Sequence, residues 1–391
     1  MQLQKLIYRL LFLVLLVFFF NACGPEHVNK EKLGNRIYYP GIDDQWIKHS
    51  AKQEGMDDSL LQQAVDFAKT QETTQMKPDF STQEQIFGKL LGPIPHSRAA
   101  TNGIILGHGY IVAEWGDTKH ADPTYSCAKS FLSVIMGIAI DRGMVKSEKD
   151  LVSDYIHDGG YDSEHNKKIT WEFHLRQTSE WQGDMWGKKD DFVGKEAFGN
   201  GERKPREIKE PGTYWEYNDV RINRFSLSIL RLWKKPLPEI LRDEIMNPIN
   251  ASNGWTYYPY YNSSVDIDGK KIPSISGGTR WGGGLWIDAR DEARFGYLML
   301  RNGKWKDKQI VSSDWIKRSV TKGPVGNDYG YLWWLNTEGK AWPSAPQNSF
   351  AALGAGSNTI WIDPKDDIVI VWRWHNGNPD ELIKRVLKAI K

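Results

Sequence analysis

The order of predicted elements indicates a mixed α/β (α+β) fold, in which an antiparallel sheet flanked by terminal helices receives a mostly helical domain. Helical periodicity dominates residues 126–266, whereas strand-like runs and glycine-rich turns lie on both sides of this segment. The folded part also begins and ends with a helical pattern. We therefore expect a discontinuous sheet domain at residues 46–125 and 267–391, with a cleft between it and the helical domain.

The first part of the sheet domain is predicted to contain one helix and one hairpin. Apolar residues recur at helical spacing in residues 60–68, behind the capping signal Asp57-Asp58. Residues 103–106 and 110–115 flank Gly107-His108-Gly109, which is typical of a β-hairpin.

Helical and strand patterns then follow in separate blocks. Helical periodicity marks residues 126–140, 151–156, the segment capped by Thr170, and 220–232. Strands are expected at residues 284–287, 329–335, 359–362 and 368–374, and a last helix at residues 382–390. Residues 183–209 and 257–272 are expected to be loops that shape the cleft.

The N-terminus has the composition of an export signal. Two basic residues precede an apolar run at residues 10–20, and Asn21-Ala22-Cys23-Gly24 follows it. This arrangement resembles a bacterial lipoprotein cleavage site, which implies removal of residues 1–22 and lipidation of Cys23, with residues 23–45 as a lipidated tether. We then expect an exported, membrane-anchored lipoprotein on the periplasmic or cell-surface face. The alternative is a plain transmembrane anchor.

Charge and composition argue against several functions. The net charge of +2, without a basic block, does not favour nucleic-acid binding. None of the nine histidines forms a His-x-x-x-His pair, so no metal and no other cofactor is expected. A Gly-x-Ser-x-Gly elbow is also missing from the sequence.

The most informative motif is Ser126-Cys127-Ala128-Lys129 at the start of a very apolar segment. Residues three apart lie on one face of a helix, so the Lys129 amine can reach the Ser126 hydroxyl. The positive end of the helix dipole favours an oxyanion at Ser126 and disfavours a charged lysine. This pair therefore suits a serine nucleophile with a lysine base.

Two neighbouring candidates fit less well. Ser319 and Lys322 have the same spacing, but Gly323-Pro324 stops that helix, so Lys322 is expected to point into water. Cys127 points about 100° around the helix from Ser126, and we expect a small buried residue there. Apart from Cys23 it is the only cysteine, so no intramolecular disulfide is expected in the mature chain.

Two later segments could complete a site around Ser126. Tyr217 follows a Pro-Gly turn where a predicted helix starts, so its phenol could share a proton with Lys129. The run Gly354-Ala355-Gly356-Ser357 opens a late strand, where glycine lets a substrate approach backbone N–H groups.

In this order, Ser126-x-x-Lys129, Tyr217-Asn218-Asp219 and Gly354-Ala355-Gly356 resemble the serine β-lactamase and penicillin-binding-protein superfamily. The nearest branch is that of class C β-lactamase-related hydrolases, the esterases and 6-aminohexanoate-dimer hydrolases. The resemblance implies a β-lactamase-like fold, with Ser126 as acylated nucleophile, Lys129 as its base, neutral at working pH, and Tyr217 as proton relay. The oxyanion-hole and substrate-binding residues that it implies are Ser126, Ser357, Gly354, Gly356, Asn218, Asp219, Trp281 and Trp286.

Two departures from the family pattern bear on the chemistry. The family usually has asparagine where this chain has Asp219, whose charge would oppose a neutral lysine. We expect Asp219 to turn away, either capping its helix or pairing with Arg221. Gly354 stands where the family usually has lysine or histidine, so the cation for a substrate carboxylate is missing. Short neutral esters or amides are therefore expected as substrates.

Two other functions stay open at this point. One is a D,D-peptidase or β-lactamase that acts on cell-wall peptides or β-lactams. The other is a non-catalytic, lipid-anchored binding protein, because many of the 18 tryptophans flank the predicted site. We expect two or three of these in the cleft and the rest in the core; they are Trp181, Trp186, Trp215, Trp281, Trp286, Trp333 and Trp334.

Overall fold

The computed structural model describes residues 37–42, 45–190 and 206–390. The predicted signal peptide, the predicted lipidation site Cys23 and most of the tether lie outside these residues. In the part of the chain that is described, no helix has both the length and the apolar character to span a membrane. The elements below all belong to the unit that begins at Tyr38.

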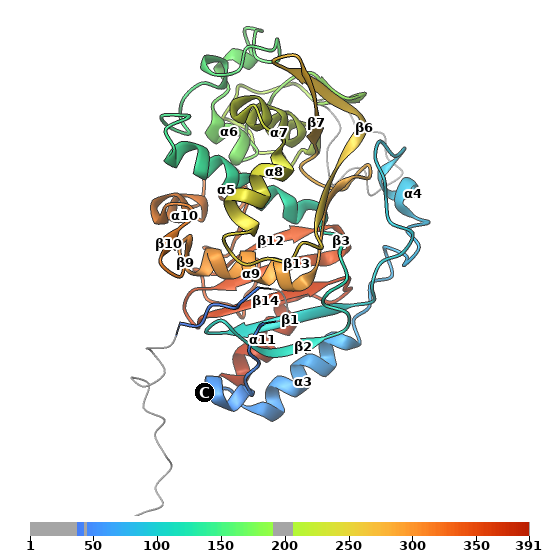
Figure 1. Cartoon of the computed structure of the whole chain (residues 1–391), viewed down its shortest axis with the longest axis vertical. Helices are drawn as coiled ribbons and strands as arrows, with labels where there is room; N and C mark the ends of the chain where they lie inside the picture. The colour runs from blue at the N-terminus through green and yellow to red at the C-terminus, as the bar shows by residue number, and fades with distance from the viewer. Residues whose placement is uncertain (1–36, 43–44, 191–205, 391) are drawn as a thin grey trace, which may run out of the picture. The chain divides into compact units, whose positions relative to one another are not determined.

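Apolar runs bounded by turn residues build a six-stranded antiparallel sheet in the order β11-β12-β13-β14-β1-β2 (Figure 1). The predicted hairpin around Gly107-His108-Gly109 joins β1 to β2. Because β1 also pairs with β14, the two ends of the chain share one sheet. The strands are β1 (Asn102–Gly107), β2 (Tyr110–Trp115), β11 (Trp334–Leu335), β12 (Phe350–Gly354), β13 (Asn358–Asp363) and β14 (Ile368–Arg373).

Helices cover both faces of this sheet. On one face α3 (Asp58–Lys69) and α11 (Pro379–Ala389) pack against each other (Figure 1). On the other face α9 (Ala289–Leu300) packs against β13, β14 and β1. Gly296 permits this close packing, because a Cβ there would lie 2.8 Å from Val369 Cγ1. The predicted α+β fold, with a sheet flanked by terminal helices, is confirmed.

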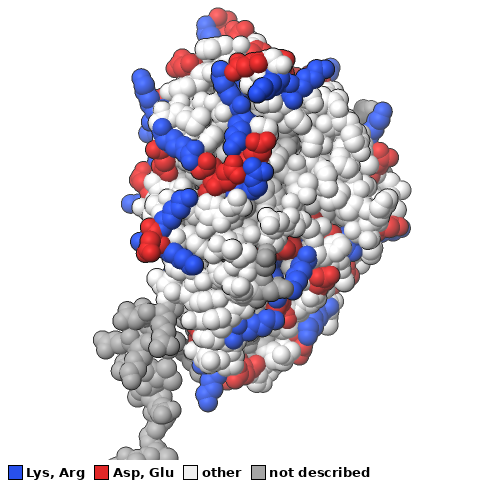
Figure 2. Space-filling model, viewed as in Figure 1, with Lys and Arg blue, Asp and Glu red and all other residues white. Residues whose placement is uncertain are grey.

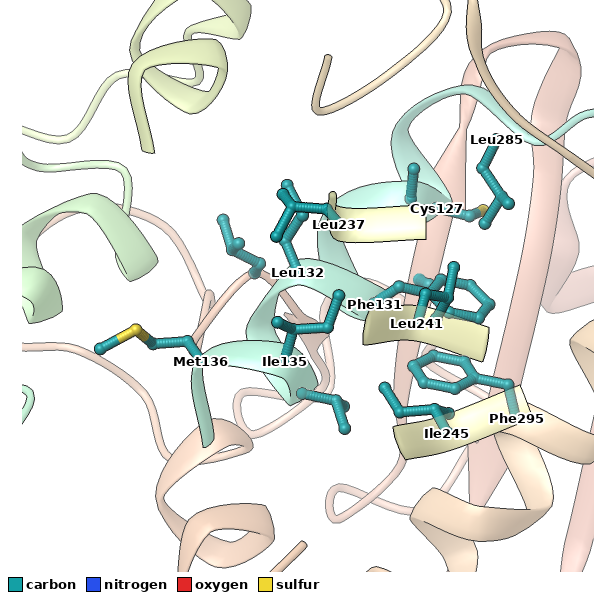
Figure 3. Packing of buried hydrophobic residues seen from close by; sticks show 14 of the residues in the cluster. Cys127, Phe131, Leu132, Ile135, Met136, Leu237, Leu241, Ile245, Leu285 and Phe295 are labelled. Carbon is teal, nitrogen blue, oxygen red and sulfur yellow. The ribbon is translucent and has the colours of Figure 1, made fainter. Parts of the chain in front are cut away.

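The segment between the two parts of the sheet is mostly helical, and its centre is α5 (Ala128–Asp141), which is buried on nearly all sides. Figure 3 shows Phe131, Leu132 and Ile135 of this helix among side chains from α8, η6 and α9. The other helical elements are α6 (Trp171–Leu175), α7 (Asp219–Trp233), α8 (Leu237–Leu241), the π-helical turn η6 (Arg242–Met246), and the 3₁₀ turns η2 (Tyr125–Cys127), η3 (Val152–Asp154) and η4 (Asn166–Lys168).

A second sheet, in the order β3-β8-β6-β7, differs from the sequence prediction. Residues 257–272 were expected to form a loop, but β6 and β7 pair there as a hairpin. A register shift between Pro259 and Ser264 interrupts the alternation of buried and exposed residues that normally marks a strand. The strands are β3 (Asp122–Pro123), β6 (Thr256–Ile267), β7 (Lys270–Ile275) and β8 (Gly284–Ile287).

Two further predictions were too long. The helix expected at residues 151–156 is only the short turn η3. The strand expected at residues 329–335 is reduced to β11, because Leu332 has a left-handed φ of 61°. The remaining short elements are η1 (Ala51–Glu54), α4 (Gln83–Phe87), β4 (Asp184–Met185), β5 (Lys188–Lys189), β9 (Lys304–Trp305), β10 (Lys308–Gln309), α10 (Ser313–Ser319) and η7 (Ala355–Ser357).

Basic and acidic side chains are interspersed on the face drawn in Figure 2, around a broad uncharged area. Exposed pairs such as Lys168 with Glu210 contribute little to stability, because water screens their charges. The described part of this face therefore has no continuous basic surface that could bind the phosphates of a nucleic acid.

Replacing Asp288 by asparagine is expected to stabilise the protein at pH 8 but not at pH 4. Asp288 caps α9 by accepting the N–H of Asp291, and asparagine caps equally well. Burial, together with the charge of Asp291, raises the pKa of Asp288 from 3.8 to about 7. When folding raises the pKa of a carboxyl, the free energy of unfolding falls as the pH rises from the ordinary pKa to the raised pKa. Urea unfolding at both pH values measures the gain in the free energy of unfolding. At about 1.4 kcal/mol per pKa unit, this gain is expected to be a few kcal/mol at pH 8. An equal effect at both pH values would contradict this assignment.

Candidate active site

Ser126 lies at the junction between strand β3 and the buried helix α5. Tyr125, directly before it, has a φ of 51°, a left-handed conformation that residues other than glycine rarely adopt. Lys129 is one turn further along, is 1% exposed, and places Nζ 2.7 Å from the Ser126 Oγ. The structure thus brings together the two side chains that the Ser-x-x-Lys spacing placed on one helical face.

The position of the Asp219 side chain differs from the predicted one. Its carboxylate accepts a hydrogen bond from Lys129 Nζ at 2.6 Å and another from Arg280 Nη1 at 3.0 Å. Asn218 caps α7 instead, because its side chain accepts the N–H of Arg221 at 3.1 Å. The prediction that Asp219 turns away from Lys129 to cap its helix or pair with Arg221 is therefore wrong.

The charges in this group determine its resting state. Burial would raise the pKa of Asp219, but the adjacent Lys129 and Arg280 charges outweigh burial and hold the pKa at about 2. Asp219 is therefore an anion at neutral pH. Lys129 therefore faces a buried anion at 2.6 Å, where the family usually has a neutral asparagine, and a neighbouring anion favours the charged form of an amine.

Tyr217 lies against both members of the Ser126–Lys129 pair. The Lys129 Nζ is 4.8 Å from the centroid of the Tyr217 ring. Burial and the negative charge of Asp219 raise the Tyr217 pKa well above 10.0, and a hydrogen bond with Ser126 opposes that rise. The phenol is therefore neutral at rest and can donate a proton to a leaving group rather than act as the first base.

The glycine-rich loop packs directly against the turn that carries Ser126. A Cβ added to Gly354 would lie 2.2 Å from the Thr124 carbonyl oxygen and 3.2 Å from the Ser126 nitrogen. Only glycine permits this approach, since 2.2 Å is far below contact distance and the obstacle is backbone. Two residues later the chain turns sharply, with left-handed φ values of 73° at Gly356 and 59° at Ser357. The loop is thus held beside the backbone N–H of Ser126.

The structure does not place all predicted substrate-binding residues at the surface of this site. Asn218 is fully buried and uses its side chain for the helix cap and for the Asp190 carbonyl. Trp281 is 0% exposed and donates to the Phe87 carbonyl at 2.8 Å, so it belongs to the core. Trp286 is partly exposed and packs on Tyr258. Substrate contact by Asn218 or Trp281 is incompatible with this burial.

Aromatic rings pack next to Tyr217. Trp334 stacks on Tyr217 with centroids 5.7 Å apart, and Trp215 and Tyr329 pack edge-on against Trp334. Trp215 and Trp334 are partly exposed, whereas Trp181, Trp281 and Trp333 are buried. Of the seven tryptophans considered in the sequence analysis, these two lie next to the predicted relay. Tyr329 was not among the predicted site residues.

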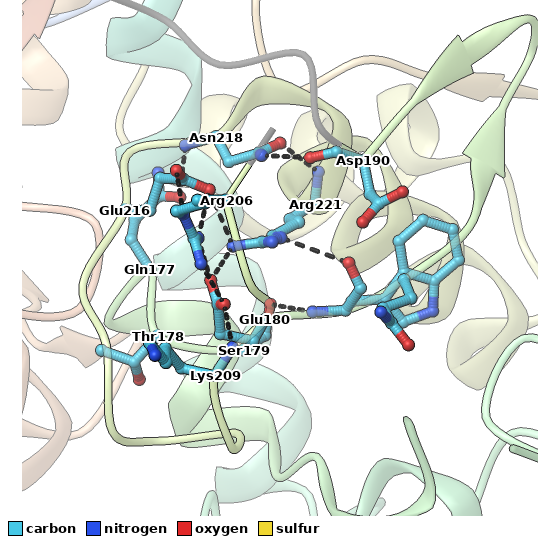
Figure 4. Close-up of polar contacts among 12 residues, drawn as sticks. Gln177, Thr178, Ser179, Glu180, Asp190, Arg206, Lys209, Glu216, Asn218 and Arg221 are labelled. Carbon is cyan, nitrogen blue, oxygen red and sulfur yellow. Dashed lines mark hydrogen bonds and ion pairs between the residues drawn. The ribbon is translucent and has the colours of Figure 1, made fainter. Parts of the chain in front are cut away.

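An ionic network that the sequence analysis missed supports the Tyr217 segment (Figure 4). The fully buried Glu180 carboxylate binds Arg206 through two contacts of 2.6 and 2.7 Å and also pairs with Arg221. The Gln177 side chain accepts the N–H of Asn218 at 3.1 Å. Because Glu180 occupies Arg221, that guanidinium is not the partner of Asp219. These contacts join residues that are 26 or 41 positions apart, and no spacing pattern indicates them.

Neither competing nucleophile found in the sequence fits the structure better. Burial raises the pKa of the Cys127 thiol, which is fully buried and contacts the Asn358 carbonyl. Lys322 pairs with Glu338 instead of with Ser319. The prediction of a small buried cysteine is confirmed, and Ser126 with Lys129 remains the candidate pair.

A family model described as β-lactamase matches residues 108–388, which include each of these site residues. The chain belongs to the β-lactamase family. Among solved structures it is similar to EstCE1, a hydrolase with promiscuous acyltransferase activity, at 14% identity and a TM-score of 0.56, covering 85% of this chain and 99% of that one. A Bacillus anthracis protein, named as a candidate 6-aminohexanoate-dimer hydrolase, matches at 19% identity and a TM-score of 0.51, covering 74% and 77%.

A third structure extends the comparison to penicillin-binding relatives. A penicillin-binding-protein homologue from Caulobacter crescentus matches at 14% identity and a TM-score of 0.54, covering 86% of this chain and 98% of that one. At these identities the likeness to solved structures establishes a common fold. The β-lactamase-family membership confirms the superfamily resemblance drawn from the three ordered motifs.

Proposed function

We propose that this β-lactamase-family protein is a serine hydrolase that cleaves small ester or amide substrates through an acyl-enzyme. The observation that carries the proposal is the 2.7 Å contact between the Lys129 amine and the partly exposed Ser126 hydroxyl. Ser126 Oγ attacks the substrate carbonyl and its proton passes to Lys129 once that amine is neutral. Tyr217 protonates the leaving group and regains its proton from the Lys129 ammonium, and water then hydrolyses the acyl-serine. The backbone N–H groups of Ser126 and Ser357 hold the oxyanion.

The substrate class follows from the residue at the third motif. Gly354 packs against the Ser126 turn and has no side chain that could bind a carboxylate. The Lys129 amine, which contacts Ser126, and the Arg280 guanidinium both bind Asp219. This balance of charge favours neutral esters and amides over penicillins. The names of two structural relatives, a hydrolase and a candidate 6-aminohexanoate-dimer hydrolase, agree with that preference.

Labelling with a fluorophosphonate tests the nucleophile. Wild-type protein is expected to be labelled and Ser126→Ala is expected to remain unlabelled, because the reagent needs an activated serine. Ser319→Ala, at the second Ser-x-x-Lys sequence, is the matched control and should be labelled like the wild type. A wild type that resists labelling would favour the non-catalytic binding protein.

Relative rates on two chromogenic substrates distinguish the hydrolase classes. Turnover of p-nitrophenyl acetate is expected to exceed that of a chromogenic cephalosporin. The opposite order would support the second candidate, a D,D-peptidase or β-lactamase.

For location, we propose export with cleavage before Cys23 and lipidation there. Mass spectrometry of the mature N-terminus tests this proposal, and an intact leader would contradict it.

A further inference from the structure

Gln83, the first residue of α4, is a fully buried amide that the proposed chemistry does not use. Its oxygen accepts the Tyr125 hydroxyl at 2.7 Å. Its nitrogen donates to the carbonyls of Thr279 and Arg280 at 3.2 and 2.9 Å. One side chain thus satisfies three buried polar groups from two segments that are far apart in the sequence.

Both segments touch the active site. Tyr125 directly precedes Ser126 and holds a left-handed φ of 51°, a conformation that persists only where surrounding contacts enforce it. Burial raises the Tyr125 pKa well above 10.0, so its hydroxyl stays a donor to Gln83. Arg280 places its guanidinium 3.0 Å from Asp219, the partner of Lys129. Gln83 therefore lies between the turn before the nucleophile and the backbone of the residue that holds Asp219.

Other contacts of the same segment make α4 a rigid support. Phe87, at the end of α4, accepts the indole N–H of Trp281 at 2.8 Å and packs its ring near Tyr125. The N–H groups of Leu91 and Gly92 donate to the Trp281 carbonyl. Gln83 is thus fixed relative to residues 279–281 by contacts other than its own.

We propose that Gln83 is a positioning residue, which holds Tyr125 in its left-handed conformation and so sets the position of the Ser126 hydroxyl relative to Lys129. The inference rests on the proposed serine-hydrolase function. Because a reacting group displaced by about 1 Å can lose about 10²-fold in rate, loss of the amide acts on kcat more than on KM.

Gln83→Leu and Tyr125→Phe test this role. Gln83→Leu is expected to lower kcat and the rate of fluorophosphonate labelling by about 10- to 100-fold, with little change in KM. Tyr125→Phe keeps the ring and removes only the hydroxyl donor, so it should show a smaller loss of the same kind. Because both act through one hydrogen bond, the double variant should be no slower than Gln83→Leu alone.

Gln83→Glu provides a readout that general destabilisation would not change. A neutral carboxylic acid can donate to a carbonyl and accept from Tyr125, whereas the ionised form can only accept and would face two carbonyl oxygens. The ratio of kcat between Gln83→Glu and wild type is therefore expected to fall as the pH rises. For Gln83→Leu the ratio should be constant with pH.

A glutamine elsewhere in the chain is the matched control. Gln309 also donates its amide to two backbone carbonyls, those of Asn302 and Val311, and lies in the β9–β10 hairpin. Gln309→Leu should lower the unfolding midpoint without lowering kcat. A wild-type kcat in Gln83→Leu, or losses that multiply in the double variant, would overturn the inference. A wild type that is not labelled would instead overturn the proposed function.

Discussion

Replacing Lys129 by methionine is expected to lower kcat/KM for an ester substrate by about 10²–10⁴-fold, the range typical of a lost general base. Methionine is similar in length but can neither accept the Ser126 proton nor donate to Asp219. Asp219 retains Arg280 as a partner at 3.0 Å, so the fold should persist. Steady-state kinetics measures the loss, and the thermal unfolding midpoint shows whether the variant is folded.

The second Ser-x-x-Lys sequence supplies the control for this experiment. Lys322 has the same spacing to Ser319 but pairs with Glu338. Lys322→Met is therefore expected to keep the wild-type kcat/KM. A folded Lys129→Met enzyme with full activity, or equal losses in both variants, would contradict the role of Lys129.

The parts of the fold that the sequence predicted are those whose signal is local. The strands β13 and β14 flank the turn at residues 363–367, and the apolar face of α11 follows an Asn-Pro cap, so periodicity and turn chemistry identify them. The long strand β6 was missed because Pro259 and a register shift interrupt its alternation. Pairing of β1 with β14 could not be derived from a pattern, since it joins the two ends of the chain.

The same distinction between local and distant contacts applies to the site. Ser126 and Lys129 are three residues apart on one helix, so their contact follows from helical geometry. The position of Asp219 depends on Arg280, which is 61 residues away, and on Glu180, which occupies the alternative partner Arg221. Gln83 likewise forms hydrogen bonds with Tyr125, Thr279 and Arg280, which are far from it in the sequence. These side chains carry no local signal, although they determine the charge and geometry of the Ser126–Lys129 pair.

Replacing Asp219 by asparagine is expected to move the acid limb of the kcat/KM profile to lower pH by about 1–3 pH units. The Asp219 carboxylate, 2.6 Å from Lys129 Nζ, stabilises the ammonium form, which cannot accept the Ser126 proton. Asparagine has the same shape without the charge and is the residue usual in the family at this position. The Asp219 pKa of about 2 means that the wild-type carboxylate stays ionised throughout the assay range, so its own titration does not contribute to the profile.

Replacing Arg280 tests the same effect of charge on Lys129, with a shift expected in the opposite direction. Its guanidinium lies 3.0 Å from Asp219 and adds a positive charge near Lys129, which disfavours the ammonium form. Arg280→Met should therefore move the acid limb to higher pH, whereas Asp219→Asn moves it to lower pH. Shifts in the same direction would show that charge at Asp219 does not control the lysine. A folded Asp219→Asn protein that is inactive at every pH would instead mean that the carboxylate itself takes part in the reaction.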